Sequence, residues 1–496
     1  MGHIGRTVDP RQDGSWQAPR PVTVPPLFSR VLWVLALTGV PALAAAPTLQ
    51  WPFDQPDVAH LRASPRKVFA HYFSPFPVSI DNRPSQEDYY TRGYLSVEGE
   101  KGKHRAYGGY LRQRPLPRPP RPETNWAELD MMEEVRLAAA LGLDGFCYDI
   151  LSTEGRHWTR LNRLLAAAQA VDPGFRIMLM PDMMAEFRRH PDRLVPAVLK
   201  VAGHPAILRD ERRRLVLAPY NAHVQRVEWW TARIAELRQN GVEVMFFPLF
   251  QGWWKQAEAF APISDGFSDW GVGTASAVLG SRRLSPQKCH AYGKLWMAPI
   301  RPQDFRPKAR VAWEAANSTL FRNMWQVAIE GKAEWAQIIT WNDYSEASEI
   351  APSTETGRVF YDLAAYYVAW FKAGRAPDLV RDAIYGIYRV QSTDIALRGQ
   401  SKRMKVVGEA SNQIELLAFL AAPGDLVIEI GTSTFRKSAP AGVTSFCVPL
   451  APGTPVFQLL RNGTNVLRLT GRRAIVSGEV EFQNLLYHGV GSVASP

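Results

Sequence analysis

The strongest constraint on the fold is a regular alternation between short apolar runs and amphipathic stretches of helical length. The apolar runs fall at residues 67–73, 145–150, 176–180, 215–220, 242–250, 266–270, 294–300 and 335–341. Between most of them, helical periodicity covers residues 126–141, 160–171, 194–201, 224–240, 313–331 and 359–373. Strands that alternate with helices in this way are typical of a parallel sheet with crossover helices. Eight such units over about 320 residues predict a (β/α)₈ TIM barrel with insertions.

An open, doubly wound parallel sheet is the alternative fold, because periodicity alone does not separate it from a barrel. No G-x-G-x-x-G motif follows an early strand, which disfavours a dinucleotide-binding version of that fold. A long irregular insertion, residues 74–123, follows the first predicted strand and contains a proline-rich run at 114–122. In a barrel, a loop after a strand lies on the catalytic face, so we expect this insertion to wall the cleft. The other interpretation is a solvent-exposed linker of extended, polyproline-like backbone.

From residue 385 the sequence changes to short alternating runs separated by turns such as Pro423-Gly424 and Asn462-Gly463. These runs, at 426–430, 444–450, 455–460, 466–469 and 474–477, predict a small all-β sandwich. The chain is therefore divided into a secretory signal region (1–46), a catalytic barrel (47–384) and an accessory β-sandwich domain (385–496).

The first residues have the pattern of a secretory signal. Arg30 precedes an apolar run at 31–40, which is followed by Ala42-Leu43-Ala44, a cleavage-site pattern. The run is too short for a transmembrane helix, although an uncleaved anchor is the alternative. We expect a protein that is secreted or periplasmic, with no membrane association after cleavage.

Lys and Arg exceed Asp and Glu by enough to give a formal net charge of +11, which favours anionic surroundings. No basic stripe interleaved with aromatic residues and no zinc-finger or helix-turn-helix signature occurs, so we expect no nucleic-acid partner. Cys147, Cys289 and Cys447 lie far apart, which predicts neither a disulfide framework nor a zinc site. With no H-E-x-x-H and no G-x-S-x-G motif, we expect a mechanism that uses neither a metal nor a cofactor. We also expect a monomer.

The segment 338–346, Ile-Ile-Thr-Trp-Asn-Asp-Tyr-Ser-Glu, is the strongest chemical signal. An apolar strand leads directly into acidic side chains, so Asp343 and Glu346 are expected at the rim of the barrel. Glycoside hydrolysis requires one protonated carboxylic acid for the leaving oxygen and one ionised carboxylate. Unlike surroundings provide both states by raising the pKa of one acid. The alternative is a loop in which both acids cap the start of a helix.

Other predicted strands also end in polar or aromatic side chains that suit sugar binding. The candidates are His71, Asp149, Asp182 and Tyr220 at the ends of the first four strands, and Trp253 after the fifth. Trp341 and Asn342, beside the acid pair, complete the set of predicted substrate-binding residues. Catalytic groups of a barrel come from several strand ends. A core histidine, an N-cap and a turn are the structural alternatives for His71, Asp149 and Asp182.

Three motifs resemble glycoside hydrolase family 71: Phe-Ala-His-Tyr-Phe at 69–73, Leu-Asp-Gly-Phe at 143–146 and Thr-Trp-Asn-Asp-Tyr-Ser-Glu at 340–346. Members of that family are α-1,3-glucanases (mutanases) with a barrel and a C-terminal β-domain, and the likeness spans residues 67–490. The resemblance implies an inverting hydrolase in which Asp343 and Glu346 match the catalytic acid pair. The chain departs from the family after Glu346, where it has Ala347-Ser348-Glu349-Ile350 in place of a Ser-His-Tyr-Ile-like segment.

The sequence thus predicts a secreted glycoside hydrolase that cleaves an α-linked, α-1,3-glucan-like polysaccharide or oligosaccharide. Asp343 is expected to act as the general base and Glu346 as the general acid, and the reverse assignment stays open. A barrel glycosidase that acts on α-mannosides is one alternative. The other is a non-catalytic polysaccharide-binding or envelope-assembly protein on a degenerate barrel, which the positive charge and the β-domain would suit.

Overall fold

The computed structural model of the protein describes residues 50–399 and 401–493. The predicted signal region, residues 1–46, lies outside these described residues. Among the helices of the described chain, none combines the length and the apolar character that crossing a bilayer requires.

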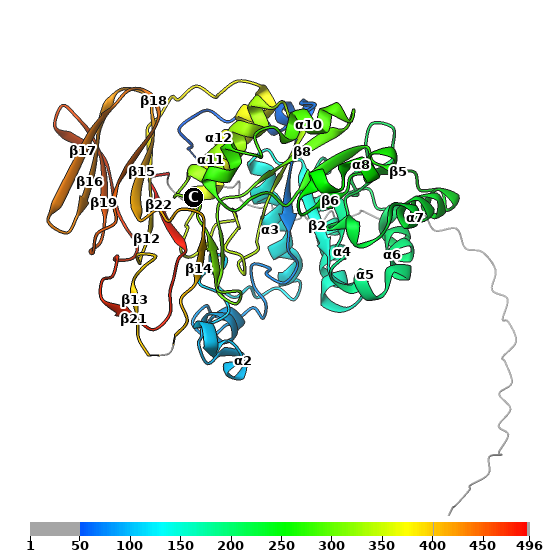
Figure 1. Ribbon diagram of the computed structural model, residues 1–496, viewed down its shortest axis with the longest axis horizontal. Coiled ribbons are helices and arrows are strands. Elements are labelled where there is room, and N and C mark those ends of the chain that lie inside the picture. The colour runs from blue at the N-terminus through cyan, green and yellow to red at the C-terminus, as the bar shows by residue number, and fades with distance from the viewer. Residues whose placement is uncertain (1–49, 400, 494–496) are drawn as a thin grey trace, which may run out of the picture. The chain divides into compact units, whose positions relative to one another are not determined.

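A curled parallel sheet lies at the centre of the α/β part of the protein, as predicted (Figure 1). In spatial order its strands are β5 (Val244–Phe246), β4 (Leu215–Leu217), β3 (Arg176–Pro181), β2 (Gly145–Ile150), β1 (Lys67–Tyr72), β11 (Trp335–Ile338), β8 (Leu295–Ile300), β7 (Gly266–Asp269) and β6 (Leu249–Phe250). The two ends of this order come from one stretch of chain, because only Phe247 and Pro248 separate β5 from β6. That stretch pairs with β4 on one side and with β7 on the other. The arrangement fits a (β/α) barrel and disfavours an open sheet.

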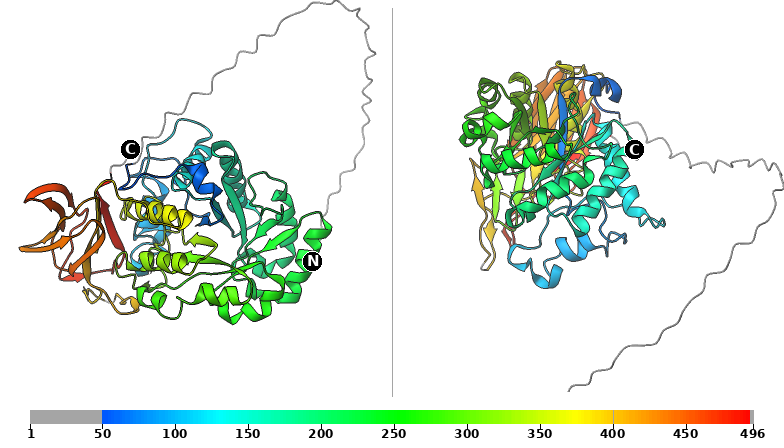
Figure 2. Two further views of the ribbon diagram at one scale, coloured as in Figure 1. Left: turned by 90° about the horizontal axis from the view of Figure 1, so that it is seen from above. Right: turned by 90° about the vertical axis from the view of Figure 1, so that its right-hand side faces the viewer.

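Helices follow most of the strands and cover the outside of the sheet (Figure 2). They are α3 (Trp126–Ala140), α4 (Gly155–Val171), α6 (Leu194–Ala202), α7 (Val227–Gln239), α8 (Ala257–Phe260), α9 (Ala275–Leu279), α10 (Ser285–Ala291), α11 (Thr319–Glu330) and α12 (Val359–Ala373). Three shorter helices are α1 (Val58–Ala63), α2 (Gly99–Gly102) and α5 (Glu186–Arg189). Helix α4 packs against β2 and β3, α7 against β5, and α11 against β8. These are the crossover helices that the sequence periodicity predicts.

Most predicted elements occur at the expected places, and the differences have local causes. The predicted helix 313–331 begins only at Thr319, because residues Val311–Trp313 form strand β10. This strand pairs with β9 (Asp304–Arg306) and β14 (Lys405–Val407). The predicted strand 242–250 is interrupted at Pro248, which lacks the N–H that a strand interior would use. The predicted strand 335–341 ends at Ile338.

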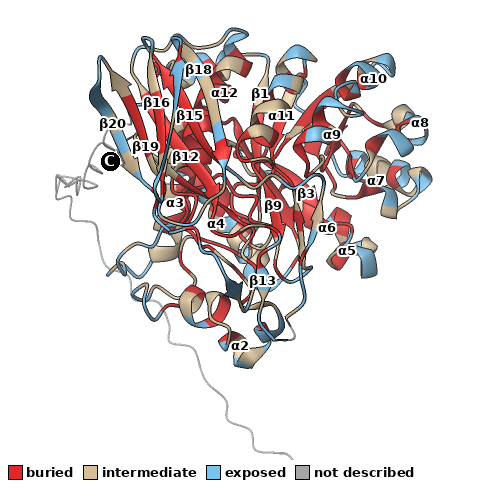
Figure 3. Cartoon of the chain, turned by 60° about the vertical axis from the view of Figure 1, so that its left-hand side comes forward, coloured by how far each residue is buried: buried red, intermediate tan, exposed pale blue. Residues whose placement is uncertain are grey.

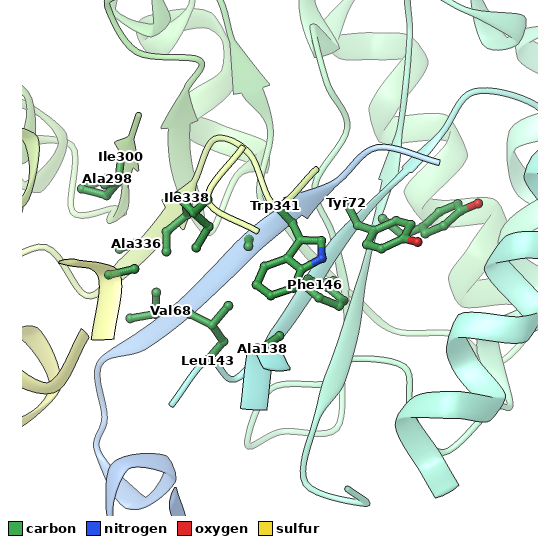
Figure 4. Close-up of a cluster of buried hydrophobic side chains, with 14 of the residues drawn as sticks. Val68, Tyr72, Ala138, Leu143, Phe146, Ala298, Ile300, Ala336, Ile338 and Trp341 are labelled. Carbon is green, nitrogen blue, oxygen red and sulfur yellow. The ribbon is translucent and has the colours of Figure 1, made fainter. Parts of the chain in front are cut away.

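Alternate residues of each strand face opposite sides of the sheet, and two apolar cores result. Val68, Phe146 and neighbouring side chains point toward the helices and belong to the larger core (Figure 4). Phe69, Cys147 and Met178 point inward and fill the ring of strands. The strands are therefore buried on both faces, whereas the helices expose their outer sides (Figure 3).

Residues after 382 form an all-β region, most of it in two antiparallel sheets, whereas β14 of this stretch pairs in parallel with β10. One sheet contains β18 (Gly442–Pro449), β15 (Gln413–Leu420), β12 (Ala383–Arg389) and β22 (Tyr487–Gly491). The other contains β17 (Ser433–Ala439), β16 (Gly424–Ile430), β19 (Val456–Arg461) and β20 (Thr464–Thr470). A short pair, β13 (Ala396–Leu397) and β21 (Glu479–Val480), lies apart from both sheets. The predicted strand 474–477 is wrong, since only Ile475 of it forms an isolated bridge, with Gly453.

The all-β region shares its core with the α/β part. Tyr385 and Phe419 of β12 and β15 belong to the same buried cluster as the helices, and Phe419 contacts Tyr366 of α12 edge to face. Helix α12 is consequently buried at nearly every position, including Lys372, whose Nζ lies 2.7 Å from Asp144. A helix that is apolar on all sides needs a partner on each side.

Candidate active site

Four of the predicted substrate-binding residues lie at inward-facing positions of neighbouring strands. The inward positions repeat every two residues, so those at Phe69 and Cys147 are followed by His71 and Asp149. By the same period, the inward positions at Met180 and Ala218 are followed by Asp182 and Tyr220, just beyond the strands. Asp182 and Tyr220 form a parallel bridge just beyond β3 and β4. The strand register therefore gathers these side chains at the carboxyl ends of the strands, where barrel active sites lie.

His71 and Asp149 form a buried pair at the centre of this rim. Their Nε2 and Oδ2 atoms are 3.6 Å apart, and the two residues are only 2% and 4% exposed. His71 Nδ1 and Asp149 Oδ1 are buried and have no hydrogen-bond partner among the described residues. Buried polar atoms without partners are costly in a finished fold, so these two atoms keep unused hydrogen-bonding capacity at the rim.

Asp343 and Glu346 lie in the loop that follows β11, beside this pair. Asp343 Oδ1 accepts hydrogen bonds from the Ser345 amide (2.9 Å), the Ser345 hydroxyl (2.6 Å) and the Glu346 amide (3.2 Å). These hydrogen bonds fix the orientation of Asp343, which caps the backbone amides of the two residues Ser345 and Glu346. No helix starts there, because the residues that follow form turns. The negative charge of Asp343 favours the protonated forms of both Asp149 and His71, although burial lowers the pKa of His71 overall.

Glu346 has the surroundings of a carboxyl group that stays protonated near neutral pH. Burial and the charges of Asp304 and Asp343 raise its pKa to about 8, and Arg306 partly opposes them. Arg306 Nη1 lies 2.8 Å from Glu346 Oε1, but Asp304 also binds Arg306, through Nε at 2.7 Å and Nη2 at 2.8 Å. The other carboxylate oxygen, Glu346 Oε2, is buried without a partner in the described chain.

The remaining acids of the rim also favour their protonated forms. Burial, with the neighbouring charge of Asp343, raises the pKa of Asp149 well above its usual range. Burial and Asp149 raise the pKa of Asp182 to about 7. Burial lowers the pKa of His71 to about 4, so its imidazole is neutral at pH 7. Burial also raises the pKa of Asp343, although the hydrogen bonds from Ser345 and the positive charge of Arg306 oppose this rise. A crowded set of buried acids cannot all be ionised, so the site favours protonated carboxyl groups.

Three predicted substrate-binding residues are placed elsewhere by the structure. Trp253 is 1% exposed and packs against Trp296 beneath the helices, so its ring offers no face to a sugar. Trp341 is fully buried and contacts Phe146 on the helix side of the sheet, because β11 ends at Ile338 and its inward alternation stops there (Figure 4). These two predictions are wrong.

Asn342 is also structural, in contrast to its predicted role. Its Oδ1 accepts a hydrogen bond from the Phe73 amide at 2.7 Å, and its Nδ2 donates to the carbonyls of Phe73 (3.0 Å) and Phe76 (2.9 Å). These three hydrogen bonds join the loop after β11 to the loop after β1. Asn342 positions the acid pair and does not reach the cleft.

The insertion at 74–123 lies against the acid pair, which favours the cleft-wall interpretation over the linker. Leu111 shares a hydrophobic cluster with Tyr344, and burial together with the charge of Asp343 raises the pKa of Tyr110 to about 12. Gln113 donates to Glu349 Oε1 and accepts a hydrogen bond from Ser353 Oγ at 2.7 Å. The segment that departs from the family pattern after Glu346 is thus in contact with the insertion.

The sequence interpretation missed several residues that complete the site. Trp270 follows β7 and contacts His71 and Tyr220 edge to face, with centroid distances of 4.8 and 4.9 Å. Gln251 Nε2 donates to the Tyr220 hydroxyl at 2.6 Å. Arg306 lies in a stretch with no catalytic motif. Only Trp270 had a detectable signal, because it ends a predicted strand as Asp149 does. Among the described residues, no three His, Cys, Asp or Glu side chains converge as metal ligands would.

A buried rim of carboxyl groups with raised pKa values can hold the proton that acid/base cleavage of an acetal requires. Residues 122–494 match the sequence profile of Glycosyl hydrolase family 71. The chain belongs to this family. It is therefore a glycoside hydrolase, as the motifs at 69–73, 143–146 and 340–346 predict.

Two relatives of this family 71 enzyme come from Schizosaccharomyces pombe. The chain is 21% identical over 383 residues to the glucan endo-1,3-alpha-glucosidase agn1 of Schizosaccharomyces pombe, covering 71% of this chain and 88% of that protein. It is 24% identical to the ascus wall endo-1,3-alpha-glucanase of the same organism, covering 69% and 88%. Among solved structures, the GH99 endo-alpha-mannosidase from Bacteroides thetaiotaomicron is similar with a TM-score of 0.49 and 14% identity, covering 62% of this chain and 98% of that one.

Proposed function

We propose that this family 71 enzyme hydrolyses α-1,3-linked glucan, with Glu346 as the general acid and Asp343 as the general base. The observation that carries the assignment is the contrast between the two acids. Glu346 keeps its proton up to a pH of about 8 and has an unpartnered buried oxygen. Burial raises the pKa of Asp343 too, but three hydrogen bonds on one of its oxygens and the charge of Arg306 favour its ionised form. The names of the fungal relatives support the substrate.

The reaction is a single displacement. The Asp343 carboxylate takes a proton from a water molecule, whose oxygen forms a bond to the anomeric carbon. The bond from that carbon to the leaving sugar oxygen breaks, and Glu346 donates its proton to this oxygen. The anomeric centre inverts. His71, Asp149, Asp182 and Tyr220 are proposed to bind hydroxyl groups of the sugar next to the scissile bond.

The proposal is tested by reducing-sugar release from insoluble α-1,3-glucan, with starch, an α-1,6-glucan and an α-mannan as comparisons. Asp343→Asn and Glu346→Gln are each expected to lower kcat by a factor of about 10²–10⁴. Asp378→Asn, which neutralises an exposed acid beyond α12, is the matched control. Unchanged hydrolysis by both active-site variants would exclude the assignment. Release of reducing sugar from the α-mannan alone would show that the substrate is a mannan and not an α-1,3-glucan. An anomer retained in the first product, observed by NMR, would contradict inversion.

We also infer the finer architecture around this chemistry. Because Pro248 interrupts a single stretch, β5 and β6 count as one strand, and the sheet is then an eight-stranded TIM barrel. The two antiparallel sheets after residue 384 form a β-sandwich accessory domain. Residues 1–46 act as a signal for secretion, and the mature enzyme is a monomer outside the cytoplasm.

A further inference from the structure

A cavity of about 530 Å³ is lined by Arg306, the residue that forms an ion pair with Glu346. It shares Arg306 and Trp270 with the candidate active site, and Arg306 links it to Glu346 through the 2.8 Å ion pair. Its volume falls within the range of about 300–1,000 Å³ that is usual for ligand sites. The cavity is lined mainly by the loops that follow β6, β7 and β8, and by Trp313 of β10.

Trp254 lines this cavity and differs from the other tryptophans of the neighbouring strand ends. It is 42% exposed, whereas Trp253, Trp270 and Trp296 are all buried. The Arg282 guanidinium lies 3.6 Å from the centre of the Trp254 ring and stacks on it. An exposed indole that is held in place by a cation on one side can offer its opposite face to a flat apolar surface, such as that of a sugar ring.

A buried carboxylate supports this arrangement. Asp269 is 3% exposed, and its Oδ2 lies 3.6 Å from Arg282 Nη1. Asp269 Oδ1 accepts hydrogen bonds from the amides of Gly252 (3.2 Å) and Gly271 (3.4 Å). Gly252 has φ +86°, and a Cβ there would lie 3.4 Å from the Trp254 ring. One anchored acid thus fixes the loop before Trp254, the loop after β7 and the stacked arginine.

We infer that Trp254, backed by Arg282 and Asp269, is a stacking platform for the sugar units on the leaving-group side of the scissile bond. The side is set by Glu346, because the general acid must contact the leaving oxygen and the cavity begins at its partner Arg306. This inference rests on the proposed function and extends it. A prealigned ring loses little conformational freedom on binding, so the platform contributes to substrate affinity.

The test compares Trp254→Ala with wild type on α-1,3-gluco-oligosaccharides of increasing length. The KM of substrates that reach the platform is expected to rise about tenfold with kcat unchanged, since stacking is equal in the ground and transition states. The shortest cleaved substrate is expected to show no change, and Trp254→Phe to restore part of the affinity. Trp229→Ala is the matched control, because Trp229 also stacks with an arginine, Arg233, but lies on α7 away from the cavity.

Equal kinetics of Trp254→Ala and Trp229→Ala at every length would overturn the platform. A length-independent loss of kcat in Trp254→Ala would overturn it too, because that result indicates a structural role. If wild type releases no sugar from any α-1,3-glucan, the proposed function fails. Co-sedimentation with insoluble α-1,3-glucan then tests sugar binding by Trp254 separately from hydrolysis. Weaker binding of Trp254→Ala alone supports the platform, and equal binding of all variants overturns it.

Discussion

At the scale of single residues, the chemistry depends on environment more than on residue type. Glu346, Asp149 and Asp182 are ordinary acids in sequence, yet burial raises the pKa of each. Burial raises the pKa of Asp343 as well, but the hydrogen bonds from Ser345 and the positive charge of Arg306 oppose this rise. Two acids three residues apart are thereby suited to different roles at one pH.

On the proposed assignment, the protonation of Glu346 determines the alkaline limb of the pH dependence of kcat/KM. A general acid works only while protonated, so activity is expected to fall as the pH rises through about 8. Arg306 favours the ionised form of Glu346, so Arg306→Gln should raise the pKa and move the alkaline limb upward by about one pH unit. The measurement is kcat/KM from pH 4 to 10 on α-1,3-glucan oligosaccharides.

Lys308→Gln is the control for this shift, because it removes a positive charge from an exposed position two residues from Arg306. An alkaline limb that stays in place in Arg306→Gln, or that moves equally in Lys308→Gln, would show that the ion pair does not tune Glu346.

At the scale of elements, the loop after β11 is held by its neighbours. Thr340 Oγ1 accepts a hydrogen bond from the Asp343 amide at 2.7 Å, and the Trp341 amide donates one to the carbonyl of His71, also at 2.7 Å. Asn342 then joins the loop to the loop after β1. Because both acids lie within four residues of Asn342, the geometry of the site depends on this join.

Asn342→Ala is expected to lower the free energy of unfolding by about 2–3 kcal/mol, since it leaves buried backbone groups of Phe73 and Phe76 without partners. It should also lower kcat, because the loop that carries Asp343 loses its attachment. Urea denaturation and steady-state kinetics measure the two effects.

Asn240→Ala, at the exposed end of α7, is the matched substitution and should change neither quantity by much. A fully stable and active Asn342→Ala enzyme would mean that water or a sugar replaces the amide, and that Asn342 is not a structural join.

At the scale of the whole molecule, a buried polar network joins the α/β part to the all-β region. Arg389 of β12 is 1% exposed, and its Nη1 lies 2.8 Å from Glu314 Oε2. The Tyr487 hydroxyl and the Ser411 amide donate to the same carboxylate at 2.5 and 3.0 Å. These contacts and the shared apolar core indicate that the two regions unfold together.

Arg389→Met is expected to lower the free energy of unfolding by about 3–5 kcal/mol, because Glu314 is left as a buried charge without its cation. The double variant Arg389→Met, Glu314→Gln should recover part of the loss. Calorimetry of wild type should give one transition. Two separate transitions in wild type, or no recovery in the double variant, would show that the network does not couple the regions.

The sequence by itself determined the order of strands and helices, because burial on both faces of a parallel sheet requires continuous apolar runs at β2, β3 and β8. It also predicted that His71, Asp149, Asp182 and Tyr220 follow strand ends, and the structure places these four residues at the carboxyl ends of neighbouring strands. Strands such as β12 and β15 were missed, because they lie outside the turn-bounded runs and are defined by pairing with distant segments.

Only the tertiary structure decided which aromatic and polar residues face the cleft. Trp253 and Trp254 are adjacent in sequence, yet one is in the core and the other is exposed, because a short helical turn points them in opposite directions. Arg306 forms an ion pair with Glu346 although it lies 40 residues earlier in the chain. The Asn342 side-chain amide donates a hydrogen bond to the carbonyl of Phe73 and does not face the cleft. The alternation of residues along a strand determines which side of the sheet each side chain faces. Contacts between loops depend instead on the positions of segments that are distant in sequence, and these positions are set only when the whole sheet has formed.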